Sequence, residues 1–436
     1  MGFPPLRERI SGANLGVNNT PGQPGASAAE HSFRKRADAG IVALLPNARR
    51  QRTHPEERMS VRIAQNLKLI GRHDAGGASN LGEGIAMKIA KNGKRYLYIA
   101  HENWPVAFSI FDVTEPRAPQ MVWQLKLPGP HARGNSLAMR GDTLLMAYQV
   151  NKYGLKPAGF QVFDIANPVE PREVTFFDLS GDTSQGTHYI SFMDGQYAHI
   201  STGAPDFESK HRHDHQFYMI VDMRNPSKPT EVGRWWMPGQ RVGDGEALPP
   251  RHEGFLDVGY RPHHTLSYPE RPDRAYIGWI DGGIIILDIS DKTRPTMISR
   301  LDYHPPFPGF THTCLPLFNR NLMLVTDEAT GDHGRDWPKR YWVVDIREEK
   351  NPVMIASMPV PENFEELHRI GGRIGAHNIH ENEPEPGSAK LENTVVTTWF
   401  SAGLRIYDIR DPFRPEEIAA FLPETPEGQR GCRISD

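Results

Sequence analysis

Four histidines occupy the same position in four successive repeats of this chain. An ungapped alignment of the first strand expected in each repeat places there Gly82, Gly134, His188, His264, His312 and His377. Only 19 of the 436 residues are His, so chance alone does not explain this register. Imidazole is the commonest metal ligand in proteins. The register therefore predicts a metal ion held by these four His, with an open side at the two Gly for water, O2 or substrate.

The repeats themselves predict the fold that brings these positions together. An apolar run, an Asp, an apolar residue and a Pro-containing turn recur six times at intervals of roughly 60 residues. The Asp residues of the six copies are Asp112, Asp164, Asp222, Asp288, Asp345 and Asp408. Each copy has strand-like runs on both sides, about four strands per repeat, which is typical of a β-propeller blade. We predict an all-β fold, a propeller of four-stranded blades with six repeats.

Two details of the propeller stay open at this stage. Segments 238–261 and 362–375 are long enough to hold further strands, so the ring could have six or seven blades. A strand at Asn66–Gly71 is expected to join the last blade and close the ring. The six motif Asp are interpreted as structural, because an Asp side chain can accept backbone N–H groups of the turn that follows it.

The recurring phrase, for example Ile286-Leu287-Asp288-Ile289, resembles the LVIVD-repeat family of propeller proteins. The resemblance extends from about residue 60 to residue 424, and it implies the scaffold without implying a reaction. In site type alone, a ring of four His is similar to the Fe(II) centre of carotenoid-cleavage oxygenases. The selenium-binding/methanethiol oxidase family is also a propeller with His-bound copper. Both similarities imply redox chemistry at the axis.

Further polar residues near this register are candidates for supporting roles. His131, in a loop leading to the channel, and Glu83, beside the ring position, are candidates for catalytic proton transfer. Residues expected to orient the ligands or to line the pocket are Glu381, His380, Glu328 and His101. His263 and His380 lie at odd offsets from the ring positions, so in regular strands both should face away from the axis. The run His211–His215 is interpreted as a solvated loop, with a second metal site as the alternative.

A metal is the only chemistry that the sequence offers, because no nucleophile elbow, phosphate loop or dinucleotide motif occurs in a suitable context. The leading hypothesis is a metal-dependent enzyme with a mononuclear four-His centre, an oxidoreductase or oxygenase acting on a small organic substrate, with O2 as candidate co-substrate. One Fe(II) or Cu ion is favoured, and Mn or Zn would also fit. The alternatives are a metal-dependent lyase or hydrolase at the same site, and a non-catalytic interaction scaffold.

Composition limits the partners and suggests three segments. The net charge of −3 gives no basic surface for nucleic acid, and the longest apolar run, Gly283–Leu287, is too short to span a membrane. We expect a disordered or loosely packed leader at 1–58, the propeller at 59–424 and a tail at 425–436. A cytoplasmic location is expected, although the apolar run Gly40–Pro46 leaves export by a weak N-terminal signal open. Oligomeric state is left open.

Overall fold

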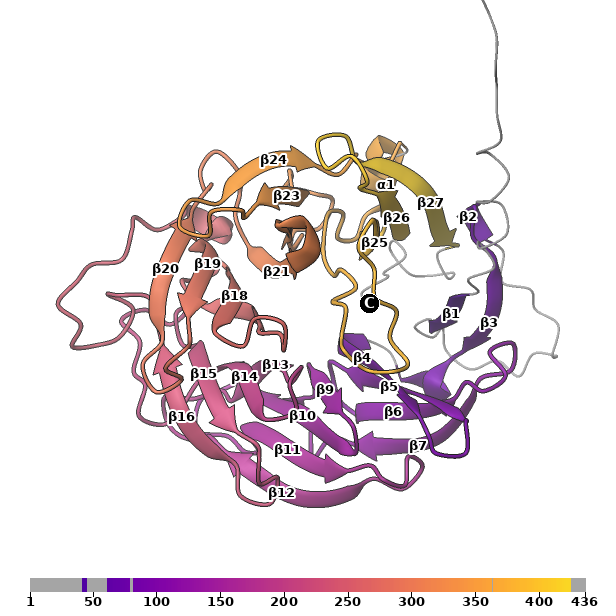
Figure 1. Cartoon of the computed structure of the whole chain (residues 1–436), viewed down its shortest axis with the longest axis horizontal. Coiled ribbons are helices and arrows are strands. Elements are labelled where there is room, and N and C mark those ends of the chain that lie inside the picture. The colour runs from indigo at the N-terminus through magenta and orange to yellow at the C-terminus, as the bar shows by residue number, and fades with distance from the viewer. Residues whose placement is uncertain (1–40, 45–60, 79–80, 363, 425–436) are drawn as a thin grey trace, which may run out of the picture. The chain divides into compact units, whose positions relative to one another are not determined.

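Six antiparallel sheets form a ring around a central axis in the computed structural model of the chain (Figure 1). The structure describes residues 41–44, 61–78, 81–362 and 364–424. The predicted all-β propeller is thereby confirmed, with six blades. The expected leader at 1–58, apart from residues 41–44, and the expected tail at 425–436 lie outside the described residues. The two segments that left a seventh blade open contain a short 3-10 turn, Gly254–Leu256, and the helix α1 (Phe364–Ile370).

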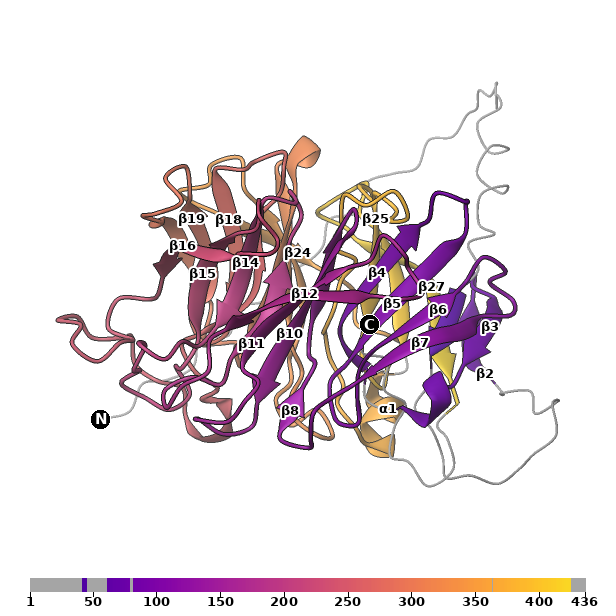
Figure 2. The same cartoon turned by 90° about the horizontal axis from the view of Figure 1, so that it is seen from below.

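In the first five blades the strands follow one another in the chain, from the strand nearest the axis to the strand at the outer edge. The sixth blade takes its outermost strand, β2, from the N-terminal part of the chain. The first blade contains β4 (Leu81–Ile89), β5 (Arg95–His101), β6 (Val106–Asp112) and β7 (Gln120–Lys126). The second contains β8 (Ala132–Arg133), β9 (Leu137–Arg140), β10 (Thr143–Val150), β11 (Gly159–Asp164) and β12 (Arg172–Asp178). The third contains β13 (Thr187–Ser191), β14 (Tyr197–Thr202), β15 (Phe217–Asp222) and β16 (Thr230–Trp235). The fourth blade contains β17 (Pro262–Leu266), β18 (Arg274–Trp279), β19 (Gly283–Asp288) and β20 (Thr296–Leu301). The fifth contains β21 (Thr311–Leu317), β22 (Leu322–Asp327), β23 (Tyr341–Asp345) and β24 (Val353–Ser357). The sixth contains β25 (Thr394–Thr398), β26 (Leu404–Asp408), β27 (Glu416–Pro423) and β2 (Val61–Gln65). Figure 2 shows the blades from the side.

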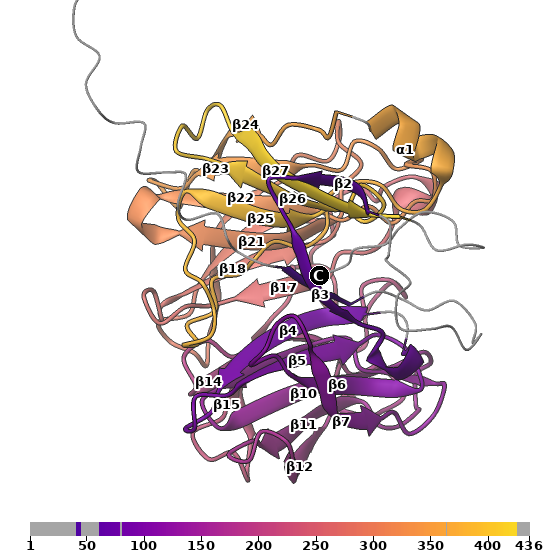
Figure 3. The same cartoon turned by 90° about the vertical axis from the view of Figure 1, so that its right-hand side faces the viewer.

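The ring is closed by β2, which pairs antiparallel with β27 on the outer edge of the last blade (Figure 3). The prediction that residues 66–71 do this is wrong by one strand. Asn66 adopts a left-handed conformation (φ 55°) and ends β2. The following strand, β3 (Leu69–His73), pairs instead in parallel with β1 (Ile41–Leu44).

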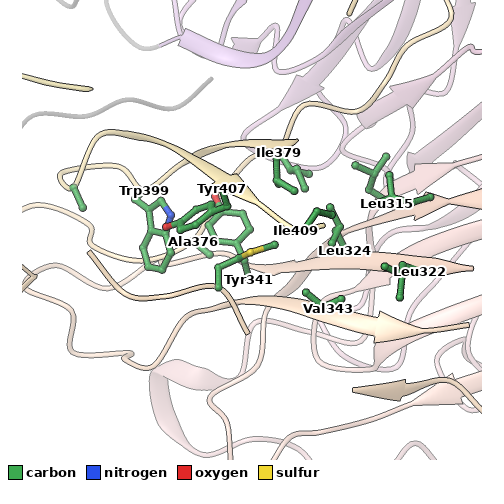
Figure 4. Close-up of a cluster of buried hydrophobic side chains, with 14 of the residues drawn as sticks. Leu315, Leu322, Leu324, Tyr341, Val343, Ala376, Ile379, Trp399, Tyr407 and Ile409 are labelled. Carbon is green, nitrogen blue, oxygen red and sulfur yellow. The ribbon is translucent and has the colours of Figure 1, made fainter. Parts of the chain in front are cut away.

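The strands in the middle of each blade are buried on both faces, because neighbouring blades pack against them. All but the last residue of β19, GIIILD, are fully buried. Figure 4 shows one such core, where Leu324 and Val343 of the fifth blade meet Tyr407 and Ile409 of the sixth. Largely apolar middle strands therefore pack blade against blade. Among the described residues no helix is long and apolar enough to cross a membrane.

The structural interpretation of the motif Asp is confirmed in every repeat. Each Asp Oδ1 accepts the backbone N–H of the residue two positions on, at 2.8–3.0 Å. At Asp345, hydrogen bonds from the side chain and then the backbone of Arg347 hold the pKa of the carboxyl below its ordinary value. The ionised carboxylate is therefore the form that the folded turn prefers.

Replacement of Asp345 by Ala should lower the free energy of unfolding by about 1 kcal/mol near neutral pH, because the turn loses a charge-assisted hydrogen bond. The folded pKa is depressed, so this contribution is present above the unfolded pKa of about 3.9 and is lost as pH falls below it. Urea unfolding of both proteins at several pH values should show their difference shrinking below about pH 4. Asp345→Asn, which keeps an acceptor oxygen, should lose less; a constant difference across pH would contradict the account.

Candidate metal centre

A β-bulge recurs in the strand nearest the axis in four of the six blades. The pairing of β13 with β14 shifts between Thr187 and Tyr189, so that His188 is the extra residue. The pairing of β21 with β22 shifts in the same way between Thr311 and Thr313, around His312. A bulge leaves its extra residue outside the ladder and re-aims its side chain. In both strands the bulge therefore directs a predicted ligand, His188 or His312, away from the regular alternation of the strand.

The bulge in the fourth blade carries two His instead of one. The β17–β18 register shifts between Pro262 and Thr265, so the alternation of faces fails across the His263–His264 pair. The expectation that His263 faces away is wrong. Its ring centroid lies 3.9 Å from that of His312, and its Nε2 lies 2.9 Å from Nε2 of His188. His263 is thus a fifth imidazole of the cluster, and the adjacent pair in the sequence was its only signal.

Glu83 lies at the centre of these rings. The β4–β5 register shifts between Leu81 and Ile85, and this wide bulge carries Glu83. Its Oε2 is 3.2 Å from His264 Nε2, and its Oε1 is 3.4 Å from His312 Nε2 and 3.5 Å from His377 Nε2. The side chain is only 11% exposed. The structure therefore brings the carboxylate, predicted only beside the ring, into contact with three of the four predicted ligands.

The side of the ring at Gly82 and Gly134 is filled, not open as predicted. A Cβ at Gly82 would lie 2.5 Å from the Asn135 carbonyl oxygen, and one at Gly134 would lie 2.5 Å from Met146 Cε. The two glycines thus allow the first and second blades to pack closely, and Glu83 occupies the space beside them. The Asn135 side chain in turn contacts both Glu83 and His188, at 3.4 and 3.5 Å.

A second carboxylate, Glu328, reaches the cluster from the end of β22. Its Oε2 is 3.8 Å from His263 Nε2, and its Oε1 is 3.9 Å from His377 Nε2. Arg373 donates a 2.8 Å hydrogen bond to Glu328 Oε1. Two groups of these side chains have donor atoms that all lie within 4.8 Å of one another: Glu83 with His263, His264 and His312, and Glu83 with His312, Glu328 and His377. Each group could hold a metal ion.

Glu381 fixes the orientation of His264. The carboxylate Oε1 lies 2.6 Å from His264 Nδ1, and Oε2 accepts a 2.5 Å hydrogen bond from the Tyr189 hydroxyl. The Tyr189 ring stacks on His264 with centroids 3.7 Å apart. Burial disfavours charge on His264, but Glu381 and Glu83 outweigh it and raise the pKa of this His to about 9. These contacts leave Nε2 of His264 directed at Glu83.

Four further side chains of the cluster, His188, His263, His312 and Glu83, favour the protonation states that bind metals. Burial lowers the pKa of His312 to about 4 and that of His188 and His263 well below the ordinary value. Burial opposes ionisation of Glu83, yet the surrounding His, with His263 foremost, hold the pKa of its carboxyl well below the ordinary value. Neutral imidazole and ionised carboxylate are the forms that coordinate metal ions.

Three predicted residues lie apart from the His/Glu cluster. The partly exposed ring of His131 has its Nε2 2.8 Å from the Lys156 carbonyl oxygen. His101 is buried inside the first blade, with Nε2 2.7 Å from Ser109 Oγ. His380 lines the cavity beside the cluster, in keeping with its prediction as a pocket residue, and its Nε2 contacts the Ala389 carbonyl oxygen. None of the three belongs to either group of potential metal ligands among the described residues.

A third group of potential ligands combines His211 and His213, in the segment between β14 and β15, with Asp257, in the segment between β16 and β17. Arg251 donates two hydrogen bonds to the Asp257 carboxylate and two more to Asp214. Both oxygens of Asp257 are thus taken by a guanidinium, whereas Arg373 bonds only Oε1 of Glu328. The axial cluster is therefore the better candidate for a metal site.

A cavity of about 330 Å³ opens on one side of the axial cluster, and Glu83 and His264 form part of its wall. The remaining wall is mainly apolar and includes Ile85, Met87 and Leu137. The loop that precedes β25 contributes residues 378–389 to it and runs across the ring toward β4 (Figure 1). Its Glu385 accepts a 3.1 Å hydrogen bond from the backbone N–H of Gly141 in the second blade. No Lys or Arg is among the described residues that line this cavity.

Comparison with known proteins supports the scaffold. Residues 216–236 and 273–302 match the LVIVD repeat family, as the motif predicted. A crystal structure of a protein from Lactobacillus plantarum is similar at 12% identity and a TM-score of 0.54, covering 79% of this chain and 86% of that one. The β-propeller domain of Cps50 (Swd1) from Myceliophteria thermophila aligns at 13% identity with a TM-score of 0.45, over 80% of this chain and 89% of that one. No curated protein sequence matches the chain.

Replacement of Gly278 tests how closely β18 packs against the bulge at His312. A Cβ at this buried position in β18 would lie 2.1 Å from the carbonyl oxygen of His312. Gly278→Ala should therefore push the bulge outward and lower the free energy of unfolding by about 1–3 kcal/mol, the usual cost of overpacking. Thermal unfolding measures the loss. Gly245→Ala is the matched control, because no atom lies within 4 Å of its Cβ position. Equal melting temperatures for the two variants would contradict the close contact.

Proposed function

We propose that this chain is a metal-dependent oxidoreductase or oxygenase that acts on a small organic molecule at the propeller axis. The observation that carries the proposal is the cavity wall: Glu83 and His264 belong both to the potential ligand set and to the lining of the cavity. A molecule in the cavity would therefore lie directly against a bound ion. A purely structural ion would need no such access, and a propeller closes without one.

The spacing of the donor atoms supports an ion among them. Ligand atoms about 2.0–2.1 Å from an ion at tetrahedral angles lie roughly 3.4 Å apart. The separations between Glu83 oxygens and Nε2 of His264, His312 and His377 are 3.2, 3.4 and 3.5 Å. Each of these nitrogens thus lies at about the distance from a Glu83 oxygen that two ligands of one ion would have.

The carboxylates change which metal is favoured. A ring of neutral His would suit Cu as well as Fe, whereas a mixed imidazole and carboxylate set favours Fe(II), Mn or Zn. Two His and one carboxylate with open positions are the ligand set of many non-haem Fe(II) oxygenases. We therefore favour Fe(II), which would activate O2 beside the cavity.

The cavity favours a substrate without negative charge. Its wall combines apolar side chains with the carboxyl groups of Glu83, Glu381 and Glu383. Ionised Glu83 would repel an anionic substrate, and no Lys or Arg is among the described lining residues. Burial raises the pKa of Glu383 to about 8, so this carboxyl is mostly neutral near pH 7. The role of the chain is to hold an apolar, neutral or cationic molecule against the cluster and to exclude water there.

A lyase or hydrolase using Mn or Zn is the second candidate. It is favoured by the same two carboxylates, because Glu83 and Glu328 supply the oxygen ligands that Mn accepts and that also occur at catalytic Zn. Such an enzyme would use the ion to acidify a substrate or to activate water, and would need no O2. An interaction scaffold without metal remains the third reading.

Elemental analysis of the untagged full chain, purified without chelator, tests the metal. We expect at least one equivalent of transition metal, Fe above all, and loss of most of it in His264→Ala. His380→Ala is the matched control, since this His lines the same cavity but belongs to none of the groups of potential ligands among the described residues, and its loss should leave the metal content unchanged. Metal-free protein that also takes up no Fe(II), Mn or Zn anaerobically, or full metal retention in His264→Ala, would refute the proposal.

Nitric oxide, added to the Fe(II)-loaded chain under argon, separates the two candidate reactions. An oxygenase needs an open position on the ion, so we expect the EPR signal of a high-spin iron–nitrosyl. Absence of that signal in iron-loaded protein would refute O2 binding and favour the lyase or hydrolase.

Glu381→Gln should weaken metal binding by about 10–100-fold, because the carboxylate behind His264 orients that ligand and strengthens its basicity. Competition with a metallochromic dye measures the affinity. Glu383→Gln, two residues away in the same cavity wall, is the control and should bind metal as the wild type does. Equal losses in both variants would mean that Glu381 acts only through the charge of the cavity.

A further inference from the structure

The donor set at the axis is larger than one ion needs. Five imidazoles and two carboxylates converge there: His188, His263, His264, His312, His377, Glu83 and Glu328. A catalytic Fe, Mn or Zn ion takes four to six ligands and leaves part of that number to water or substrate. Resting on the proposed function, we propose that the centre holds two metal ions bridged by the carboxylate of Glu83.

Glu83 divides the histidines into two sets. Its Oε2 faces three of them, lying 3.2 Å from His264 Nε2, 3.9 Å from His263 Nδ1 and 4.0 Å from His188 Nε2. Its Oε1 faces the other two, His312 and His377. A bridging carboxylate binds one ion with each oxygen, and two such ions lie roughly 3.5–4 Å apart. His188, His264, His312 and His377 fit this arrangement through Nε2. His263 lies between the two sides, because its Nδ1 faces Oε2 of Glu83 whereas its Nε2 faces His188 and Glu328.

Glu328 completes the set on the Oε1 side. Its Oε1 is 3.9 Å from His377 Nε2, and its Oε2 is 4.0 Å from His312 Nε2. The second ion would thus have two imidazoles, Glu328 and one oxygen of Glu83. The two groups of potential ligands share Glu83 and His312, so two ions bound by them would lie next to each other.

The other side has three imidazoles in close contact. Nε2 of His188 and Nε2 of His263 are 2.9 Å apart. Two nitrogens bound to one ion at right angles would lie about 3.0 Å apart. Gln149 Oε1 lies 3.2 Å from Nδ1 of His188, so Nδ1 carries the proton and Nε2 is free to bind an ion. The first ion would take His188, His263, His264 and Oε2 of Glu83.

Counting bound Co2+ tests the second ion. The full chain should carry His211→Ala and His213→Ala, which remove the third potential ligand group from the count. Equilibrium dialysis against Co2+ should give two equivalents. His188→Ala and His377→Ala, added one at a time, should each leave one equivalent, because each removes a ligand from one side only. His380→Ala should still bind two. Circular dichroism checks that each variant is folded.

The outcomes separate this inference from the proposed function. Two equivalents in the parent, with an EPR signal reduced by magnetic coupling, support the bridged pair. One equivalent in the parent overturns the second ion and leaves the metal-dependent function standing. No bound Co2+ overturns both. Two uncoupled ions that both survive His188→Ala and His377→Ala would place the binding elsewhere and also overturn the inference.

Discussion

The bulge in the strand nearest the axis is the constraint on which the candidate site depends. A regular strand would send alternate side chains into the two neighbouring blades, and no two adjacent residues could reach the axis together. The bulges release His188, His263, His264, His312 and Glu83 from that alternation. Each bulge is held by a ladder that resumes on either side of it. The polar cluster is thus positioned by backbone pairing, which is far stiffer than a loop.

The cost of burying this cluster is met by complementary charges and by the apolar packing around it. Ionised Glu83 lies among imidazoles, Arg373 pairs with Glu328, and Glu381 pairs with His264. Outside the cluster, the middle strands of the blades are largely apolar, as β19 shows, with a few hydrogen-bonded polar side chains such as His101 and His199 among them. A group of unpaired imidazoles and carboxylates would be strongly destabilising in such surroundings, whereas a mutually neutralised one is tolerated. A bound cation would relieve the remaining like-charge contacts.

Much of the fold could be predicted because the same sequence motif occurs six times. The motif Asp, the turn after it and the strand spacing identified blades, and each motif Asp does accept the expected turn N–H. His188, His264 and His312 lie in corresponding bulges of three blades, whereas His377 lies in the segment before β25. Two failures have one cause, because a bulge leaves no mark in a single sequence: His263 was assigned to the wrong face and Glu83 was placed beside the ring. The sequence also named Glu328 and Glu381 as supporting residues, but only tertiary packing sets which His each of them contacts.

Anomalous X-ray diffraction from crystals of the protein, purified without chelator, tests the central claim most directly. Data collected above and below the absorption edge of the metal found by elemental analysis would locate the ion. The account predicts anomalous density on the propeller axis within bonding distance of Glu83 and of His264, His312 or both. A well-ordered cluster with no peak there, or a peak confined to the surface group at His211 and His213, would contradict it.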